Sequence, residues 1–184
     1  MKLDLFTEKS LLSPNLKKYV KKGVLIDTAP LLILFLGYYD KKHKTSYLHK
    51  FDSGYTIFDY ELLRTFLSGL RPFRLKITPH IFHEFYKHIQ NLLDSRLYDF
   101  FPEISEYLLK IKEQHILKND IINHELFEKL EIGEHSLFLT IQEGKYGCIL
   151  TDERKVCGIL EKNHSVLTMN YSNEIKPFLL TQLG

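Results

Sequence analysis

Four acidic residues lie where short apolar runs end or where the next helices are expected to begin. Asp27 and Asp152 each directly follow an apolar run typical of a buried strand. Glu84 falls in the second turn of one expected helix, and Glu134 in the first turn of another. Parallel α/β sheets bind ligands outside the carboxyl ends of their strands. The four positions therefore predict that these side chains meet at that edge of a sheet.

Gathered carboxylates predict a site for a hard divalent cation. Mg²⁺ and Mn²⁺ prefer oxygen ligands, and carboxylates that lie close together repel one another until a cation neutralises them. A metal ion held in such a cluster generates hydroxide from water and stabilises negative charge on a phosphodiester. The four acids thus predict a hydrolytic site that needs no nucleophilic side chain.

Each acid also has a structural explanation. Asp27 and Asp152 belong to a residue type that is favoured as a cap of the helix that follows. Glu84 and Glu134 are early-helix acids that complement the helix dipole. Glu84 also shares a helical stripe with His80 and His88, but no further zinc ligands are evident, so solvated or hydrogen-bonded histidines are favoured over a zinc site. These explanations apply to each acid alone, whereas a metal site accounts for all four together.

Short apolar runs alternate along the chain with segments of helical periodicity. This alternation is typical of βαβ units and predicts an α/β fold, a three-layer α/β/α sandwich with a central, mostly parallel sheet. The pattern predicts strands at 23–26, 74–77, 148–150 and 165–169. It predicts helices at 31–36, 56–69, 79–93, 103–118, 134–142 and 154–161, with a less regular segment at 121–130.

The composition is that of an ordinary globular protein. The 184 residues are 44% hydrophobic and 26% charged, which is enough for one domain with a sizeable core. The net charge of +2 permits a nucleic-acid partner without requiring one. Two cysteines are too few for a disulfide framework or a four-cysteine zinc site.

The pattern divides the chain into a lysine-rich appendage at 1–22 and a domain at 23–184. The most apolar stretch, 23–36, is interrupted by Asp27 and Pro30 and is shorter than the ~20 residues that a membrane span needs. No targeting segment is visible in the sequence. We therefore expect a soluble, cytoplasmic protein without a membrane partner.

Four segments around the acids follow one another in a recognisable order. Residues 24–28 form a strand that ends in an aspartate and a hydroxyl residue, and 77–84 contain a Thr-Pro step leading to a helix with a glutamate. Residues 133–134 are Gly-Glu before an apolar helix, and 149–155 read strand-Thr-Asp-Glu-Arg-Lys. These segments resemble the motifs of the PIN-domain family, whose members are mostly Mg²⁺- or Mn²⁺-dependent ribonucleases. The resemblance covers about residues 23–170.

The resemblance implies a metal-dependent endoribonuclease that hydrolyses phosphodiester bonds in single-stranded RNA. Whether one or two metal ions bind is left open. Glu153 stands where many relatives carry a second aspartate. The implied site for Mg²⁺ or Mn²⁺ consists of four ligands and two threonines that support them by hydrogen bonds, namely Asp27, Glu84, Glu134, Asp152, Thr28 and Thr151.

Residues 38–55 are expected to form a basic and aromatic connection near the site. Lysines attract phosphates, and exposed tyrosines stack on unpaired bases. Lys41, Lys42, Lys44 and Tyr47 are therefore candidate RNA-binding residues. The alternative is an ordinary polar loop whose tyrosines pack on the core.

Partners and rival functions follow from the same resemblance. Toxin-type relatives form homodimers and bind an antitoxin, so a homodimer and an antitoxin-like inhibitor protein are expected partners beside the RNA substrate. Three rivals stay open: a non-catalytic PIN-like binding or regulatory module, a DNA-directed nuclease with the same site, and another metal-dependent hydrolase on a similar sheet. Four intact acids favour catalysis over a binding module, and the absence of an Asp-x-Asp pair at Asp27 disfavours a phosphatase.

Overall fold

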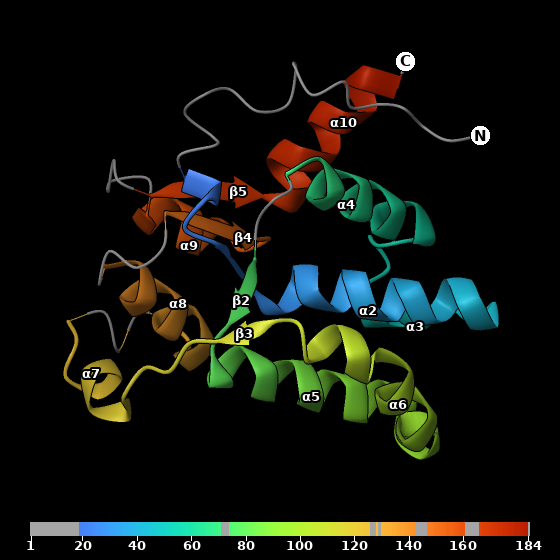
Figure 1. Ribbon diagram of the computed structural model, residues 1–184, viewed down its shortest axis with the longest axis horizontal. Helices are drawn as coiled ribbons and strands as arrows, with labels where there is room; N and C mark the ends of the chain where they lie inside the picture. Colours follow the sequence, from blue (N-terminus) through green and yellow to red (C-terminus); the bar gives the residue numbers. More distant parts are fainter. Residues whose placement is uncertain are drawn as a thin grey trace.

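A parallel sheet organises the protein. The computed structural model describes residues 19–70, 74–125, 128, 130–142, 147–160 and 166–183, apart from the side chains of residues 95, 182 and 183. Within these residues, five parallel strands form one sheet in the order β3-β2-β1-β4-β5 (Figure 1). The strands are β1 (Val24–Ile26), β2 (Leu75–Ile77), β3 (Lys112–Glu113), β4 (Cys148–Thr151) and β5 (Leu167–Asn170).

Helical segments connect these strands. Between β1 and β2 lie α2 (Thr28–His43), α3 (Tyr47–Phe51) and α4 (Ile57–Gly69). Between β2 and β3 lie α5 (Pro79–Leu93), the short η1 (Asp94–Arg96) and α6 (Leu97–Leu108). The remaining segments are α7 (Lys118–Ile122) and α8 (Ile132–Gln142) before β4, α9 (Arg154–Leu160) before β5, and the π-helix η2 (Tyr171–Ile175) and α10 (Lys176–Leu183) after it.

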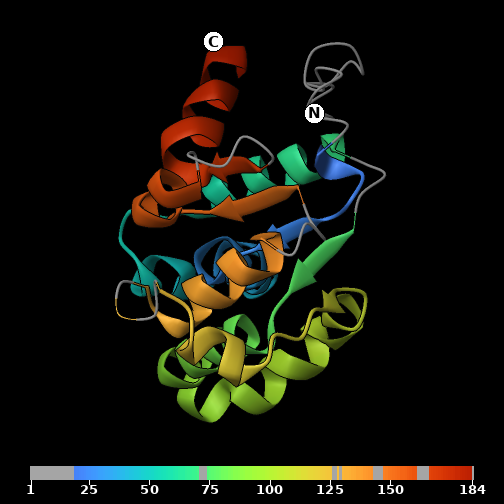
Figure 2. The ribbon, with the colours of Figure 1, turned by 90° about the vertical axis from the view of Figure 1, so that its left-hand side faces the viewer.

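The sheet lies between two layers of helices. Helices α2 and α4 cover one side, and α8 and α9 cover the other (Figure 1). The view from the side of α7 and α8 shows α2 behind α8 (Figure 2). The central strands β1 and β4 are fully buried, as expected for strands that are covered on both faces. The predicted three-layer α/β/α sandwich is confirmed, with a sheet that is parallel throughout.

The strand order reverses at the centre of the sheet. The chain adds β2 and β3 on one side of β1, and then β4 and β5 on the other side. The amide of Asp27 donates to the carbonyl of Leu150 over 2.9 Å, which extends the pairing of β1 with β4 by one residue. The carboxyl ends of β1 and β4 thus flank the topological switch point, where open α/β sheets bind their ligands.

The basic and aromatic connection expected at 38–55 is helical over most of its length. Residues 38–43 continue α2, and residues 47–51 form α3. No helix-breaking residue lies between Gly37 and His43, and basic residues in the last turn of α2 suit its dipole. The buried Asp40 carboxylate then accepts from the amides of Tyr47 and Leu48, at 2.9 and 2.7 Å, which starts α3.

Three other elements differ from the sequence-based expectation. The helix expected at 103–118 is α6, which ends at Leu108, and the short strand β3 follows it. Gly133 was expected to precede a helix, but it lies inside α8. The chain after β5, for which no element was expected, forms η2 and α10, and α10 packs beside α4 (Figure 1).

The predicted appendage at 1–22 falls mostly outside the described residues, which begin at Tyr19. Val20 belongs to the core and is 3% exposed, and the amide of Gly23 donates to its carbonyl over 2.9 Å. The end of the predicted appendage therefore packs with the domain. Within the described part of the chain, no helix combines the length and apolar character needed to cross a membrane.

Candidate functional site

Asp27 lies at the centre of the sheet edge, directly after β1. Its side chain is 5% exposed and caps α2 by accepting from the amide of Thr28 over 2.7 Å. The hydroxyl of Thr151, at the end of β4, donates to its other oxygen. The same hydroxyl accepts from the amide of Glu153 over 3.0 Å. Two neighbouring strand ends are thus joined through one buried carboxylate.

Glu84 reaches this edge from the second turn of α5. Thr78 caps α5 and Pro79 occupies its first turn, as the Thr-Pro step predicts. The hydroxyl of Thr28 donates to Oε2 of Glu84 over 2.8 Å. The carboxylate also lies against the backbone of Gly133, where a Cβ would meet Oε1 at 2.3 Å and Oε2 at 2.6 Å. Because Gly133 has no side chain, the Glu84 carboxylate has room beside the first turn of α8.

Glu134 and Glu153 bring two more acids to the same region. Glu134 lies in the first turn of α8, and its Oε2 accepts from the amide of Glu131 over 2.9 Å. Desolvation raises the pKa of Glu153, and the nearby carboxylates of Glu134 and Asp152 raise it further. Glu153, which the sequence placed beside the site without a role, is therefore part of its electrostatics.

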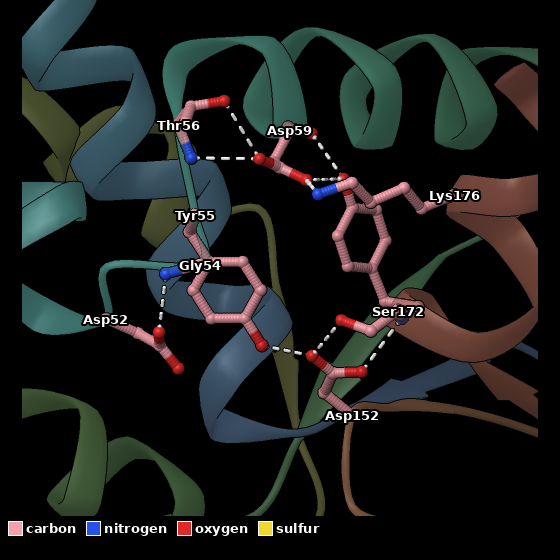
Figure 3. Close-up of polar contacts among 9 residues, drawn as sticks. Asp52, Gly54, Tyr55, Thr56, Asp59, Asp152, Ser172 and Lys176 are labelled. Carbon is pink, nitrogen blue, oxygen red and sulfur yellow. Dashed lines mark hydrogen bonds and ion pairs between the residues drawn. The ribbon is translucent and has the colours of Figure 1, made fainter.

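Asp152 is held by residues from two distant segments (Figure 3). Its Oδ1 accepts from the amide of Ser172 over 2.8 Å, and its Oδ2 accepts from the Ser172 hydroxyl over 2.6 Å. The hydroxyl of Tyr55 also donates to Oδ2. The carboxylate of Asp152 therefore bonds to these donors and does not cap α9. Capping α9 was the structural explanation that the sequence offered for Asp152.

A buried polar network anchors the segment that carries Ser172 (Figure 3). The hydroxyl of Tyr171 donates to Asp59 Oδ1 over 2.9 Å, and Lys176 Nζ lies 2.7 Å from the same oxygen. Desolvation alone would raise the pKa of Asp59, but hydrogen bonds from Lys176, Tyr171 and Thr56 outweigh it and lower the pKa. The network ties the first turn of α4 to η2 and α10.

The electrostatics of Asp27 are those of a crowded acid. Burial raises its pKa from the ordinary value of 3.8 to about 6. Hydrogen bonds from Thr151 and Thr28 lower the pKa, whereas the charges of Glu84 and Glu134 raise it. Perturbed carboxyl groups of this kind are common at functional sites. The structure thus brings Asp27, Glu84 and Glu134 into one electrostatic group.

The four predicted ligands are near the switch point, but they do not form one tight cluster. Among the described residues, no three histidine, cysteine or carboxylate side chains are grouped so as to hold a metal ion. Instead, Glu84, Glu134 and Asp152 each bond to donors of the protein. Their oxygen atoms are the donors that Mg²⁺ and Mn²⁺ prefer, so the set fits such an ion chemically.

The three candidate RNA-binding lysines lie at the far end of α2. Lys41 forms an ion pair with Glu61, and Lys42 lies 2.9 Å from Glu103. Lys44 is the residue that ends the helix. At a rise of 1.5 Å per residue, α2 places these lysines roughly 20 Å from its first turn. The expectation that they rise near the carboxylates is therefore wrong.

Tyr47, the fourth candidate RNA-binding residue, belongs to the core. Its side chain is 8% exposed, and its ring centroid lies 6.1 Å from that of Tyr39. A ring in this position offers no free face to an unpaired base. For Tyr47 the alternative from the sequence, a tyrosine packed on the core, is the one that the structure shows.

Two residues at the site were not found from the sequence. Tyr55 gives no signal, because nothing in its neighbourhood links it to Asp152, 97 residues away. Ser172 lies two residues past β5, so the strand-end rule that selected Asp152 also points to this region. The rule was applied to acidic residues alone, so Ser172, which donates hydrogen bonds, was not selected.

No model of a known family matches this chain, and neither a curated protein nor a solved structure matches it.

Proposed function

We propose that the protein is a metal-dependent nuclease whose site comprises Asp27, Glu84, Glu134 and Asp152. One observation carries the proposal: a buried carboxylate at the sheet's switch point has its pKa raised to about 6 by burial and by two further carboxylates from other helices. Holding these carboxylates close together costs folding free energy, and a bound divalent cation would offset that cost. The choice of single-stranded RNA as substrate rests on the resemblance of the four motif segments.

Asp27 is the central residue of the proposed site. Its hydrogen bonds from Thr28 and Thr151 fix the carboxylate while leaving acceptor capacity on both oxygens. The two threonines therefore hold a ligand in place, as second partners of metal ligands generally do. Thr28 also connects Asp27 to Glu84, since its amide donates to one acid and its hydroxyl to the other.

Glu84 and Glu134 complete the oxygen-donor set from two helices. Glu84 lies against the first turn of α8, where the helix dipole favours negative charge. Asp152 contributes a fourth carboxylate from the end of β4, the strand that pairs with β1. A bound Mg²⁺ or Mn²⁺ would supply an activated water and stabilise charge on the phosphate. The four carboxylates would hold the ion, and the hydrogen bonds from Thr28 and Thr151 would keep Asp27 oriented toward it.

The test is cleavage of a labelled single-stranded RNA by the full chain with Mn²⁺, with Mg²⁺ and with EDTA. We expect cleavage that requires the metal and that falls at least ~100-fold in Asp27→Asn, because one ligand charge is lost while an asparagine still caps α2. Glu106→Gln is the matched control, since Glu106 is an exposed acid paired with Lys110 on α6. Circular dichroism confirms that each variant is folded.

The outcomes separate the proposal from its rivals. Equal cleavage by wild type and Asp27→Asn would show that a contaminating nuclease, and not this site, is active. A folded wild type that cleaves nothing but binds Mn²⁺ through Asp27 in calorimetry supports the non-catalytic module. Faster cleavage of single-stranded DNA than of RNA would support the DNA-directed nuclease, with the proposed site unchanged.

A further inference from the structure

Three donors converge on the Asp152 carboxylate from two segments that are far apart in the sequence. The Tyr55 hydroxyl comes from two residues before the start of α4, and both Ser172 donors come from the first turn of η2. Two of the donors are side-chain hydroxyls on Oδ2, and the third is a main-chain amide on Oδ1. A carboxylate has about four acceptor sites, so Oδ1 keeps capacity for a further partner.

Both hydroxyl-bearing residues are themselves fixed. Tyr55 is 8% exposed, and its ring stacks on Phe51 with centroids 6.2 Å apart and planes at 11°. Ser172 follows Tyr171, whose hydroxyl is bonded to the buried Asp59. Contacts other than those with Asp152 therefore hold both donor residues in place.

A purely structural link between the end of β4 and η2 explains only part of this arrangement. One hydrogen bond would suffice to link the end of β4 to η2, yet three charge-assisted donors restrain a single carboxylate. The π-helix at η2 places both the amide and the hydroxyl of Ser172 on that carboxylate, and π-helical turns are frequent at functional sites. Restraining both oxygens fixes the direction in which the remaining acceptor site of Oδ1 points.

We propose that Tyr55 and Ser172 are positioning residues that hold the Asp152 carboxylate in the orientation needed for the metal site. This inference rests on the proposed function, because it assigns Asp152 to that site. Neither residue touches the reacting atoms. Their effect is transmitted through Asp152, in the manner of the outer partners that orient metal ligands.

The experiment compares Tyr55→Phe, Ser172→Ala and the double variant with wild type. Tyr55→Phe keeps the ring that stacks on Phe51, and Ser172→Ala keeps the main-chain donor. Two quantities are measured on the full, folded chain: Mn²⁺ affinity by calorimetry, and the rate of Mn²⁺-dependent cleavage of labelled single-stranded RNA. Both are expected to fall by about 10- to 100-fold in the double variant, the usual range for such outer partners.

Two controls make the result specific. Ser172→Thr keeps a hydroxyl and is expected to restore most of the affinity lost in Ser172→Ala. Tyr60→Phe removes a hydroxyl from another buried tyrosine, one that packs against Gly37 and not against Asp152, and is expected to change neither quantity. An unfolding midpoint for each variant separates lost stability from lost positioning.

Failure of the inference can be told from failure of the proposed function. If wild type is active, Asp27→Asn is inactive and the double variant matches wild type in affinity and rate, the inference alone is overturned. If wild type binds Mn²⁺ but cleaves nothing, the nuclease proposal fails, and the Mn²⁺ affinities of the variants decide the inference. A wild type that neither binds Mn²⁺ nor cleaves RNA overturns both.

Discussion

At the residue scale, two opposing effects act on the carboxylate of Asp27. As the cap of α2 it accepts from an amide, which favours its charged form. Burial and the neighbouring Glu84 and Glu134 disfavour that form more strongly, so its pKa rises to about 6. A cap alone would not need a buried site among other acids. The cost to stability of ionising Asp27 can be measured directly.

In EDTA, wild type is expected to lose stability as pH rises from about 4 to about 6. The folded pKa of Asp27 exceeds the unfolded value, so the native state binds the proton more tightly and the unfolded state gains as the proton leaves. The difference between the folded and unfolded pKa values of Asp27 corresponds to a loss of about 3 kcal/mol in the free energy of unfolding at neutral pH. Asp27→Asn does not titrate, so its stability relative to wild type should increase over this pH range.

Urea unfolding across this pH range checks the prediction, with Glu106→Gln as the exposed-acid control. A constant difference between wild type and Asp27→Asn from acid to neutral pH would show that Asp27 is not held with a raised pKa. It would also remove the observation on which the proposed site depends.

Gly133 offers a second test at the residue scale. Alanine there would place a Cβ within 2.3 Å of the Glu84 carboxylate and force that side chain to move. We expect Gly133→Ala to lower Mn²⁺ affinity by about 10-fold, in the range found when a ligand loses its orientation. Gly158→Ala is the matched control: it also lies in a helix, a Cβ there meets no atom within 4 Å, and alanine should stabilise by about 0.5–1 kcal/mol.

Calorimetry and urea unfolding on both glycine variants give the comparison. Unchanged Mn²⁺ affinity in Gly133→Ala would show that the contact with Gly133 does not orient Glu84 as a ligand, and would contradict the role given to Glu84 in its present position.

The positions of the acids were predictable from the sequence, but their partners were not. Asp27 and Asp152 follow apolar runs, and that local pattern alone locates them at the sheet edge. The partners of Asp152 are 97 and 20 residues away, so only the fold brings them together. Gly133 reads as a helix breaker in the sequence, whereas its actual role depends on how closely α5 approaches α8.

At the element scale, α2 shows where local pattern and packing diverge. Its tyrosines and lysines suggested a loop, yet the helix continues for 16 residues because no residue in its second half breaks it. Asp40, buried at its end, starts α3 through two amides. Strand β3 has two exposed residues, and a segment that short carries no recognisable strand pattern. The sequence pattern therefore located the buried strands β1 and β2 but missed the second half of α2 and the exposed strand β3.

The contact between α2 and α4 makes a prediction at this scale. A Cβ on Gly37 would lie 2.3 Å from Cβ of Tyr60, an atom fixed close to the backbone of α4. Alanine at a helical position normally stabilises by up to about 1 kcal/mol. Here overpacking should outweigh that gain, and Gly37→Ala is expected to destabilise by about 1–3 kcal/mol.

Urea unfolding of Gly37→Ala, alone and combined with Tyr60→Gly, tests this contact. Glycine at position 60 removes the Cβ that clashes, so in the double variant the added cost of Gly37→Ala should vanish. A single variant that is more stable than wild type would show that α2 and α4 can separate at little cost. The helix then would not be a rigid support for Asp27 at its other end.

At the scale of the whole molecule, the strand order explains why distant residues meet. Because the strand order reverses at β1, the carboxyl ends of β1 and β4 become neighbours, although Asp27 and Thr151 are 124 positions apart in the sequence. Figure 3 shows the consequence on one side of the site, where residues before and within α4 meet residues after β5. The sheet thus places acids from four segments at one edge, and a cation bound there would stabilise the entire fold.

Mn²⁺ is therefore expected to raise the stability of wild type at neutral pH. A ligand that binds only the native state contributes about 2.7 kcal/mol when its free concentration is 100 times its Kd. Asp27→Asn and Glu84→Gln should lose this stabilisation, and Glu106→Gln should keep it. Since Asp27 must be ionised to bind the cation, the effect in wild type should fade as the pH drops below about 6.

Thermal unfolding with Mn²⁺ or with EDTA, for each variant and at several pH values, provides the measurement. An equal Mn²⁺ effect in wild type, Asp27→Asn and Glu84→Gln would place the cation elsewhere on the protein. An effect that grows at acid pH would contradict the involvement of a carboxylate with a raised pKa. Loss of the effect in the two site variants alone, together with its decline below about pH 6, is the pattern that cation binding at the switch point requires.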